Sequence, residues 1–338
     1  NDVTNFDGWI RQYSGSVNVK WFGAVGDGVT DDRLAIQNAI NIGDTYIPSG
    51  VFRVSTELIV NLNNITINGN GKSSYIKSDD GLHSIIYANN KSGLEIYGLH
   101  LATIAQTNAT AYKGMVFLHN CRSCTIRDNG IFYFGHKGIY LLDSSFCIVE
   151  NNIFGESFGT IQDSADISIT GNSSFNTINS NICNGKYADH GILIQDPYTN
   201  STPTGNIIIN NQVSEHDAYG IVVYVTTDYD TKTVVSNNIV KDIRGNTGAG
   251  AFGAGIYIQR AGGTIVSNNN VSNCCLDTTN FETLGIGCIS VTGPTTINTV
   301  YPVVVEGNVI TSTRGVGIYA ATGSWDVSIL NYSIVSTG

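Results

Sequence analysis

The feature that most limits the fold of this chain is an asparagine that recurs in a repeated pattern of apolar residues. In the copy at Val234–Val240, an apolar residue precedes the asparagine by three positions and another follows it by two. The asparagines of the copies are Asn129, Asn152, Asn181, Asn211, Asn238, Asn269 and Asn308. Subtracting neighbouring numbers gives spacings of 23, 29, 30, 27, 31 and 39 residues. A variable period around a short fixed core is typical of a solenoid whose loops differ in length.

Asparagine has two physical advantages at a repeated bend. It tolerates left-handed backbone, and its amide can hydrogen-bond to the asparagine stacked above or below it. The flanking apolar positions repeat together with the asparagine, so chance in an asparagine-rich chain does not account for the pattern. We therefore expect Asn238 and Asn269 to be buried at a bend, with each amide near the next.

The bulk composition agrees with a β-solenoid and excludes some partners. The chain has 338 residues, 38 of them glycine, with 13% charged residues and a formal net charge of −10. This composition is typical of all-β proteins. The negative charge argues against nucleic acid and anionic membrane surfaces as partners, and no apolar run is long enough for membrane insertion. The chain starts without Met and stops within the pattern, so we expect it to be part of a longer protein.

The seven cysteines do not form a recognisable disulfide framework. Cys124 and Cys147 each lie five residues before a repeated asparagine, so they are expected to stack in neighbouring turns and face inward. Cys121 and Cys124 have a CxxC spacing but no second pair or histidine at zinc-finger spacing. We predict buried free thiols, no metal site and no cofactor.

The N-terminal part differs in character from the repeats. Residues 1–19 are polar around Trp9 and are interpreted as a lead-in strand or linker. A short amphipathic helix is predicted at about 31–42, with Thr30 as its N-cap and acidic residues in its first turn. Such a helix can cover the open end of a β-solenoid, whose edge would otherwise pair with other chains.

Two strings near this helix carry a family resemblance. Residues 22–32 read Phe-Gly-Ala-Val-Gly-Asp-Gly-Val-Thr-Asp-Asp and are followed by Ala-Ile-Gln-Asn-Ala-Ile at 35–40; residues 47–54 read Ile-Pro-Ser-Gly-Val-Phe-Arg-Val. This combination resembles the entry to the pectate-lyase-like right-handed parallel β-helix superfamily, in particular the central domains of bacteriophage tailspikes. The motif covers about residues 20–70, and the repeats extend the likeness to about 335.

The resemblance implies an all-β, right-handed parallel β-helix with a short N-terminal capping helix, formed by residues 20–338 as one domain. It also implies a homotrimer on a virion tail or elsewhere outside the cell, with a bacterial surface polysaccharide as its partner. Chemistry does not follow, because the superfamily includes lyases, glycoside hydrolases, epimerases and non-catalytic adhesins.

A second repeated strand, Gly-Ile-x-apolar, predicts the outer surface of the coil. Alternation along such a strand sends the first and third residues after the glycine inward and the second and fourth outward. The outward residues include Tyr140, Gln195, Tyr224, Tyr257, Gln259 and Tyr319. Amphipathic rings suit stacking on sugars, although a protein–protein face in a trimer would have the same composition.

Carboxylates occupy one further repeated position, four residues after the asparagine. Glu156, Glu215 and Asp242 stand there, and Glu215 and Asp242 are on consecutive turns about 4.8 Å apart. Glu156 should lie about 10 Å from Glu215. Glycoside hydrolysis needs two carboxyl groups about 5–5.5 Å apart for retention or 6.5–9.5 Å for inversion. We predict Glu215 and Asp242 as the catalytic pair, with Glu156 as the reserve partner.

The loops that follow this position are the variable ones and are expected to wall a groove. The predicted substrate contacts are Tyr140, Tyr224, Tyr257, Gln259, His216, Asp217 and Arg244. If the predicted pair is not catalytic, the alternatives are Asp163, Asp189 and Asp196 or a site between subunits. His136 and His190 are expected to be ordinary surface histidines.

The function predicted from these features is that of a tailspike depolymerase, an endo-glycoside hydrolase cleaving a capsule or O-antigen polysaccharide with paired carboxylates. A polysaccharide lyase of the same fold and a non-catalytic carbohydrate-binding adhesin remain alternatives. The string Asp189-His190-Gly191 is similar to the Gly-His-Gly element of polygalacturonases, but the preceding turn lacks the paired aspartate of that family.

Overall fold

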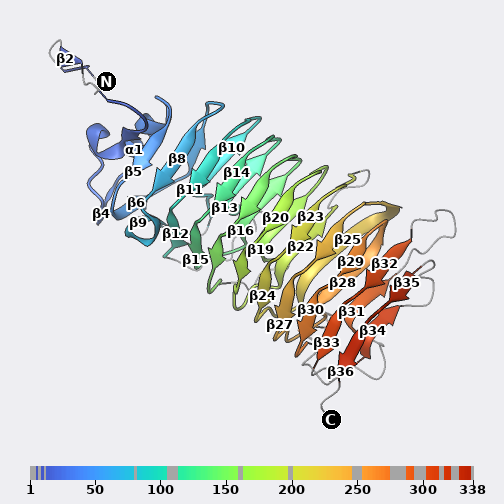
Figure 1. Ribbon diagram of the computed structural model, residues 1–338. Coiled ribbons are helices and arrows are strands. Elements are labelled where there is room, and N and C mark those ends of the chain that lie inside the picture. The colour runs from blue at the N-terminus through green and yellow to red at the C-terminus, as the bar shows by residue number, and fades with distance from the viewer. Residues whose placement is uncertain are drawn as a thin grey trace.

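The protein is a parallel β-helix in which the chain winds through three long sheets, as the computed structural model shows (Figure 1). The structure describes residues 5–6, 9–10, 13–79, 82–104, 113–158, 163–196, 201–245, 253–274, 287–292, 302–311, 316–320 and 327–335. Each full turn contributes one strand to each sheet, and every pairing between turns is parallel. The predicted all-β parallel β-helix is confirmed.

The three sheets differ in strand length. The ten-stranded sheet consists of β7 (Leu58–Val60), β10 (Ile86–Asn89), β13 (Gly114–His119), β16 (Lys137–Leu142), β19 (Ala165–Thr170), β22 (His190–Gln195), β25 (Tyr219–Asp230), β28 (Ile256–Gly262), β31 (Gly287–Thr292) and β34 (Val316–Ala320). The first twelve-stranded sheet consists of β3 (Val17–Asn18), β5 (Thr45–Ile47), β8 (Thr66–Gly69), β11 (Glu95–Tyr97), β14 (Thr125–Arg127), β17 (Ile148–Glu150), β20 (Thr177–Asn179), β23 (Ile207–Ile209), β26 (Val234–Ser236), β29 (Ile265–Ser267), β32 (Val303–Glu306) and β35 (Val327–Leu330). The second twelve-stranded sheet consists of β4 (Asp27–Asp31), β6 (Gly50–Val54), β9 (Ser74–Ser78), β12 (His100–Thr103), β15 (Gly130–Phe132), β18 (Ile153–Phe154), β21 (Ile182–Cys183), β24 (Gln212–Ser214), β27 (Ile239–Lys241), β30 (Asn270–Ser272), β33 (Val309–Thr311) and β36 (Ser333–Val335).

The repeated asparagines form the predicted ladder inside the coil. All seven are at most 2% exposed and lie at the bend between the two twelve-stranded sheets. Asn238 is representative, since its Nδ2 and its backbone N–H both donate to Asn269 Oδ1, at 3.0 and 2.9 Å. The left-handed residue of this bend is the preceding one, for example Asn237 with φ 57°. The expectation that the ladder asparagine itself would be left-handed is therefore wrong, since its role is to satisfy buried backbone groups.

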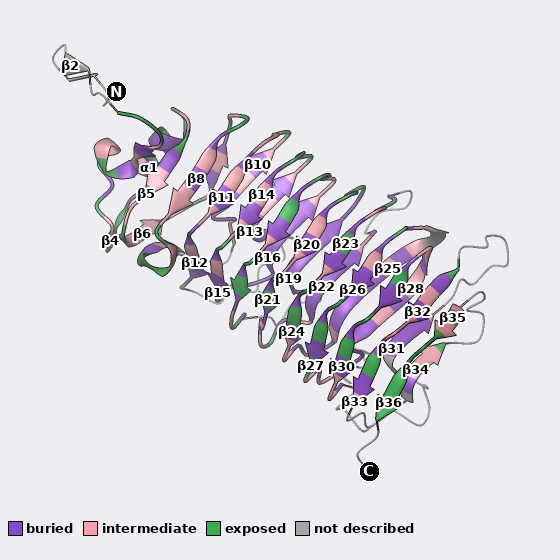
Figure 2. Ribbon diagram, viewed as in Figure 1, coloured by how far each residue is buried: buried purple, intermediate pink, exposed green. Residues whose placement is uncertain are grey.

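A second inward stack lies at the bend before the first twelve-stranded sheet. Cys124 and Cys147 occupy neighbouring turns of it and are buried free thiols, as predicted. The stack continues into asparagines, where the Cys147 N–H donates to Asn176 Oδ1 at 2.9 Å and Asn176 Nδ2 donates to Asn206 Oδ1 at 3.0 Å. Figure 2 shows that buried positions recur from turn to turn along the coil, except in the last strands, β35 and β36.

Helix α1 (Arg33–Ile40) closes the N-terminal end of the coil, as Figure 1 shows. Its residues Ile36, Ala39 and Ile40 are fully buried in the core, as expected for a cap. The helix is shorter than the predicted 31–42, and Thr30 is not its N-cap because the Thr30 hydroxyl donates to Asp27 instead. Among the described residues, no helix has both the length and the apolar character needed to cross a membrane.

The remaining short elements are near the N-terminus. The 3₁₀ helices are η1 (Val19–Phe22) and η2 (Gly71–Ser73), and an antiparallel pair is formed by β1 (Asn5–Phe6) and β2 (Trp9–Ile10). Residues 5–6 and 9–10 of the predicted lead-in segment therefore form strands.

Candidate functional site

The outer face of the ten-stranded sheet presents columns of polar and aromatic side chains. Ile139 and Leu141 of β16 are buried in the core and Tyr140 lies between them, as the predicted alternation requires. The strand register places Tyr140, Tyr257 and Tyr319 in one column and Gln195, Tyr224 and Gln259 in the next. The Tyr257 hydroxyl donates to Gln259 Oε1 at 2.9 Å. Tyr224, Tyr257 and Gln259 are half-buried, so part of each remains accessible.

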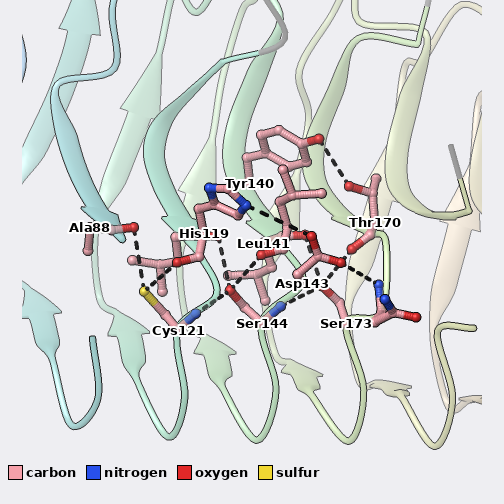
Figure 3. A network of polar contacts seen from close by, with 12 residues as sticks. Ala88, His119, Cys121, Tyr140, Leu141, Asp143, Ser144, Thr170 and Ser173 are labelled. Carbon is pink, nitrogen blue, oxygen red and sulfur yellow. Dashed lines mark hydrogen bonds and ion pairs between the residues drawn. The ribbon is translucent and has the colours of Figure 1, made fainter. Parts of the chain in front are cut away.

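Tyr140 differs from the other predicted platforms because its ring is only 4% exposed. Its hydroxyl accepts a hydrogen bond from Thr170 Oγ1 at 3.0 Å, and Phe117 stacks on its ring with centroids 4.7 Å apart. Figure 3 shows this contact beside the His119–Asp143 pair, whose Nε2 and Oδ2 are 3.9 Å apart. A ring so enclosed cannot stack on a sugar, and we no longer place Tyr140 among the substrate contacts.

The predicted catalytic residues Glu215 and Asp242 follow paired strands of adjacent turns, since Ser214 pairs with Lys241. Both have left-handed backbone, with φ 65° and 57°, and both are half-buried. The third predicted acid, Glu156, is exposed and follows β18, two strands away from β24 in the same sheet. The register of the three acids is therefore as expected.

Each of the two half-buried carboxylates has a close partner. Arg244 places one guanidinium nitrogen 3.7 Å from a Glu215 oxygen and another 3.4 Å from an Asp217 oxygen. Asn273 Nδ2 donates to Asp242 Oδ1 at 2.6 Å. Arg244 and Asp217, both predicted to contact substrate, thus lie together beside Glu215.

His216 lies inside the coil and not on its surface. Its side chain has no exposed area, and its Nε2 is 3.1 Å from Oδ2 of the equally buried Asp166. A polysaccharide has no access to this position. His216 is therefore withdrawn as a substrate contact.

A second group of titratable side chains, called here the gathered set, lies where strands of the ten-stranded sheet begin. Its members are Lys137, Asp163, Asp189 and His190. The register aligns Lys137, Ala165, His190 and Tyr219 as neighbours along the coil axis. Lys137 Nζ donates to the backbone carbonyl of Asp163 at 3.0 Å, and His190 Nε2 lies 3.8 Å from Asp163 Oδ1. His190 is only 6% exposed, so the expectation of a surface histidine is wrong; His136 is similarly buried.

The two aspartates of this set have opposite electrostatic surroundings. The contact with the His190 ring at 3.8 Å, together with the charge of Lys137, lowers the pKa of Asp163 and outweighs the opposite effect of burial. Burial raises the pKa of Asp189, whose carboxyl also accepts a hydrogen bond from the Asp163 N–H. Two neighbouring carboxyls with pKa values driven apart can supply an ionised group and a proton donor. Burial lowers the pKa of Lys137 to about 8.

Aromatic rings extend from this set along the coil. The rings of His190 and Tyr219 stack with centroids 5.6 Å apart, and those of Tyr219 and Tyr257 stack at 4.8 Å. Each ring belongs to the next strand of the ten-stranded sheet. Together they form an amphipathic wall that continues from the titratable set, a surface on which a chain of sugar rings can lie.

The predicted acids and the gathered set belong to one corner of the coil. The Asp217 N–H donates to the Ala188 carbonyl at 3.1 Å, and the N–H groups of Ala218 and Tyr219 donate to the Asp189 carbonyl at 2.9 and 3.0 Å. The loop that begins at Glu215 therefore lies directly against the turn that carries Asp189. Among the described residues, no three His, Cys, Asp or Glu side chains cluster as metal ligands would.

The sequence contained a signal for the gathered set. Lys137, His190 and Tyr219 each stand immediately before the glycine of a Gly-Ile strand. That position faces outward at the start of the long strand, so chemistry-bearing residues there meet along the axis. Asp163 has no such signal, because it precedes β19 in a turn without repeated spacing.

Comparisons with known proteins agree with this fold. The model of the family described as rhamnogalacturonase A/epimerase, pectate lyase-like matches residues 16–276. A depolymerase of Klebsiella phage K64-1, described as specific for capsule K30/K69, is 23% identical over 317 residues, covering 73% of this chain and 40% of that protein. The chain thus spans less than half the length of the curated relatives it matches.

Two solved structures are similar over almost the whole chain. The A-module of mannuronan C-5 epimerase AlgE4 from Azotobacter vinelandii has a TM-score of 0.69 at 18% identity, covering 94% of this chain and 95% of that one. The surface adhesin PfbA of Streptococcus pneumoniae has a TM-score of 0.66 at 18% identity, covering 95% and 92%. At this identity the two likenesses establish the fold alone.

Proposed function

Because the chain belongs to the rhamnogalacturonase A/epimerase, pectate lyase-like family, we propose that it is the β-helix of a bacteriophage tailspike that cleaves a bacterial surface polysaccharide, a capsule or an O-antigen. The proposed reaction is endo-glycoside hydrolysis. The likeness to a phage capsule depolymerase over most of the chain supports the substrate class and a place on the virion tail. The observation that carries the reaction is the gathering of Asp163 and Asp189 with His190 and Lys137 at the start of the paired strands β19 and β22. The pKa of Asp163 is lowered there and that of Asp189 is raised.

In this proposal Asp189 is the general acid. Its raised pKa keeps a proton available for the oxygen of the leaving sugar, while Asp163 stays ionised beside His190 and Lys137. Asp163 then attacks the anomeric carbon or activates a water molecule. The two residues precede the paired strands β19 and β22 of neighbouring turns. A retaining enzyme would use Asp163 as the nucleophile, and an inverting one would use it as the base that activates water.

The originally predicted pair, Glu215 and Asp242, stays a second candidate for the same reaction. It lies one turn further along the same corner, and Arg244 beside it can bind an anionic group of the sugar. Its side chains are 41% and 39% exposed, against 30% for Asp163, and we therefore rank it second.

A lyase is the alternative that a specific observation favours. Elimination needs a base that takes a carbon-bound proton, and the pKa of Lys137, lowered to about 8, makes its neutral amine available near neutral pH. Lys137 is only 2% exposed, so a substrate has to displace the side chains that cover its Nζ before the amine can act. The nearby His190 and Tyr219 could return the proton to the leaving oxygen. A binding module without catalysis is the third possibility, in line with the fold likeness to a surface adhesin.

The deciding experiment is mass spectrometry of products from a panel of capsular and O-antigen polysaccharides. Hydrolysis adds one water per cleaved bond, whereas elimination leaves the mass unchanged and creates a double bond. Asp189→Asn and Asp163→Asn are expected to lower kcat by about 10²–10⁴-fold, with polysaccharide binding and Tm retained. Asp128→Asn, a half-exposed carboxylate at another bend, is the matched control and should keep full activity.

The same assay separates the two carboxylate pairs. Full activity of Asp163→Asn and Asp189→Asn, with loss in Glu215→Gln and Asp242→Asn, would move the site to the second pair. Full activity in all four variants would contradict hydrolysis by either pair. No new reducing ends from any substrate, with retained binding, would favour the adhesin.

We also propose that the protein acts as a homotrimer. Exposed apolar residues begin four strands of the second twelve-stranded sheet, where Figure 2 shows exposed positions: Ile153, Ile182, Ile239 and Val309. The exposed polar residues Gln212 and Asn270 stand between them in the same row. A partly apolar row repeated along the coil suits a closed symmetric contact that uses one patch in every subunit. Sedimentation at micromolar concentration should give the trimer mass, and Ile239→Lys should weaken it; a stable wild-type monomer would contradict the proposal.

A further inference from the structure

Asp166 and His216 break the pattern of the coil at two matching places. The turns on either side of Asp166 have a glycine at its position, Gly138 and Gly191, and the turn after has Gly220. His216 is five residues after a ladder asparagine, where the next turn has the buried Ile243. Inside the core, a carboxyl and an imidazole thus stand where neighbouring turns have a glycine or an apolar side chain.

The core is shaped around these two side chains. Both are completely buried, with His216 Nε2 and Asp166 Oδ2 3.1 Å apart, and the Gly185 N–H donates to the same oxygen at 3.1 Å. A Cβ at Gly185 would clash with Asp166 Oδ1, whereas one at Gly191 would first meet Val213 Cγ1 and the Gly220 carbonyl and would be 3.2 Å from His216 Cε1. Asp166 therefore occupies space that Gly185 leaves open in the intervening turn.

The pair costs free energy where it stands. Burial of a carboxyl and an imidazole removes their hydration, and the hydrogen bond between them offsets only part of that loss. Asp166 Oδ1 and His216 Nδ1 have no hydrogen-bond partner within the described residues. Replacing such a pair by apolar residues of similar volume is often neutral or stabilising, so stability alone is a poor reason for the pair.

The contacts on either side suggest another reason. Asp166 is in the strand that Asp163 precedes, and Ser164 Oγ accepts a hydrogen bond from the Asp189 N–H at 2.9 Å. His216 lies between the two acids that Arg244 bridges, and its carbonyl accepts the Arg244 N–H at 3.0 Å. The contact between Asp166 and His216 spans the turn that carries β22. It therefore links the turn of Asp163 to the loop of Glu215 from inside the coil.

We propose that Asp166 and His216 are positioning residues, which hold the loop of Glu215 and Asp217 in register with the turn of Asp163 and Asp189. This inference rests on the proposed function for its consequence in turnover. The predicted shift of the loop does not depend on the proposed function, because it follows from removal of the buried contact that holds the loop. A displacement of about 1 Å in an active site can cost about 10²-fold in rate.

The test is the double variant Asp166→Gly/His216→Ile. It places at position 166 the glycine of both neighbouring turns, and at position 216 the isoleucine that the next turn has at Ile243. It is expected to fold with a Tm equal to or above that of the wild type. The amides of Asp217, Ala218 and Tyr219 should exchange with solvent about tenfold faster or more, and kcat should fall about 10–100-fold, while KM changes by less than about threefold. The conservative Asp166→Asn, which can keep both hydrogen bonds, should restore wild-type values.

The matched control is Thr231→Val. Thr231 and Thr264 form a fully buried hydroxyl contact of 3.0 Å away from this corner, so the variant loses a buried polar contact without changing kcat or the exchange of the three amides. Wild-type exchange and kcat in the double variant would overturn the inference. So would its failure to fold, because the pair would then serve folding. Absence of wild-type turnover on every substrate would overturn hydrolysis, while amide exchange would still decide the role of the pair.

Discussion

The asparagine ladder gives a prediction whose size follows from individual hydrogen bonds. In Asn238→Leu, the Nδ2 donations to the carbonyls of Ile208 and Ser236 and to Asn269 Oδ1 would be lost. Asn269 Oδ1 would keep the backbone N–H of residue 238 as a donor. The Asn211 N–H, which donates to Asn238 Oδ1 at 2.9 Å, would lose its acceptor in a fully buried place. One orphaned buried donor costs about 1–3 kcal/mol.

The loss should be visible in equilibrium denaturation. For 338 residues, about 2.1 cal/mol/K of unfolding entropy per residue converts this cost to a fall in Tm of about 1–4 °C. Asn270→Leu is the matched control, because Asn270 is exposed on the neighbouring turn and the variant should change Tm by less than about 1 °C. Equal losses in both variants, or none in Asn238→Leu, would refute the assignment of the energy to the ladder.

Three further predictions concern titration and thiols. The rate of hydrolysis by the aspartate pair should decline as pH rises through the raised pKa of Asp189, because the general acid then loses its proton. The rate of elimination should instead increase toward pH 8 as Lys137 deprotonates. A pH profile of initial rates on one polysaccharide distinguishes the two reactions. The pKa of Lys137 is about 8 in the folded state against 10.5 in the unfolded state, so the native state binds fewer protons between these pH values. As pH rises from 8 to 10.5, the free energy of unfolding of the wild type should therefore increase by up to about 3 kcal/mol relative to Lys137→Met. Urea denaturation measures this difference, and a difference that does not change with pH would contradict burial of the charge. The neighbouring Cys124 thiol, together with burial, raises the pKa of Cys121. For Cys124, the Cys121 thiol lowers the pKa, but the Cys147 thiol and burial outweigh it and raise the pKa to about 11. Both buried thiols should resist Ellman's reagent in a Cys275→Ser/Cys288→Ser background until denaturant is added, and rapid native labelling would refute their inward placement.

The ladder and the Gly-Ile strands were readable from the sequence because each is a repeated local pattern. The period locates the turns, and alternation assigns each side chain to the inside or the outside. The same logic correctly placed Glu215 and Asp242 on adjacent turns. It failed for His216, since a position count cannot tell that an inward residue has found a buried partner two strands away at Asp166.

What the sequence by itself determined was therefore the coil, its register and the residues at each repeated position. The meeting of Asp163 with Asp189, His190 and Lys137 was decided only by the tertiary structure. Asp163 belongs to a turn of irregular length, and its place relative to the next turn depends on how parallel strands pair across the coil. Side chains 26 residues apart become neighbours there because one turn of the helix separates them. Burial then raises the pKa of Asp189, whereas the neighbouring His190 and Lys137 lower that of Asp163.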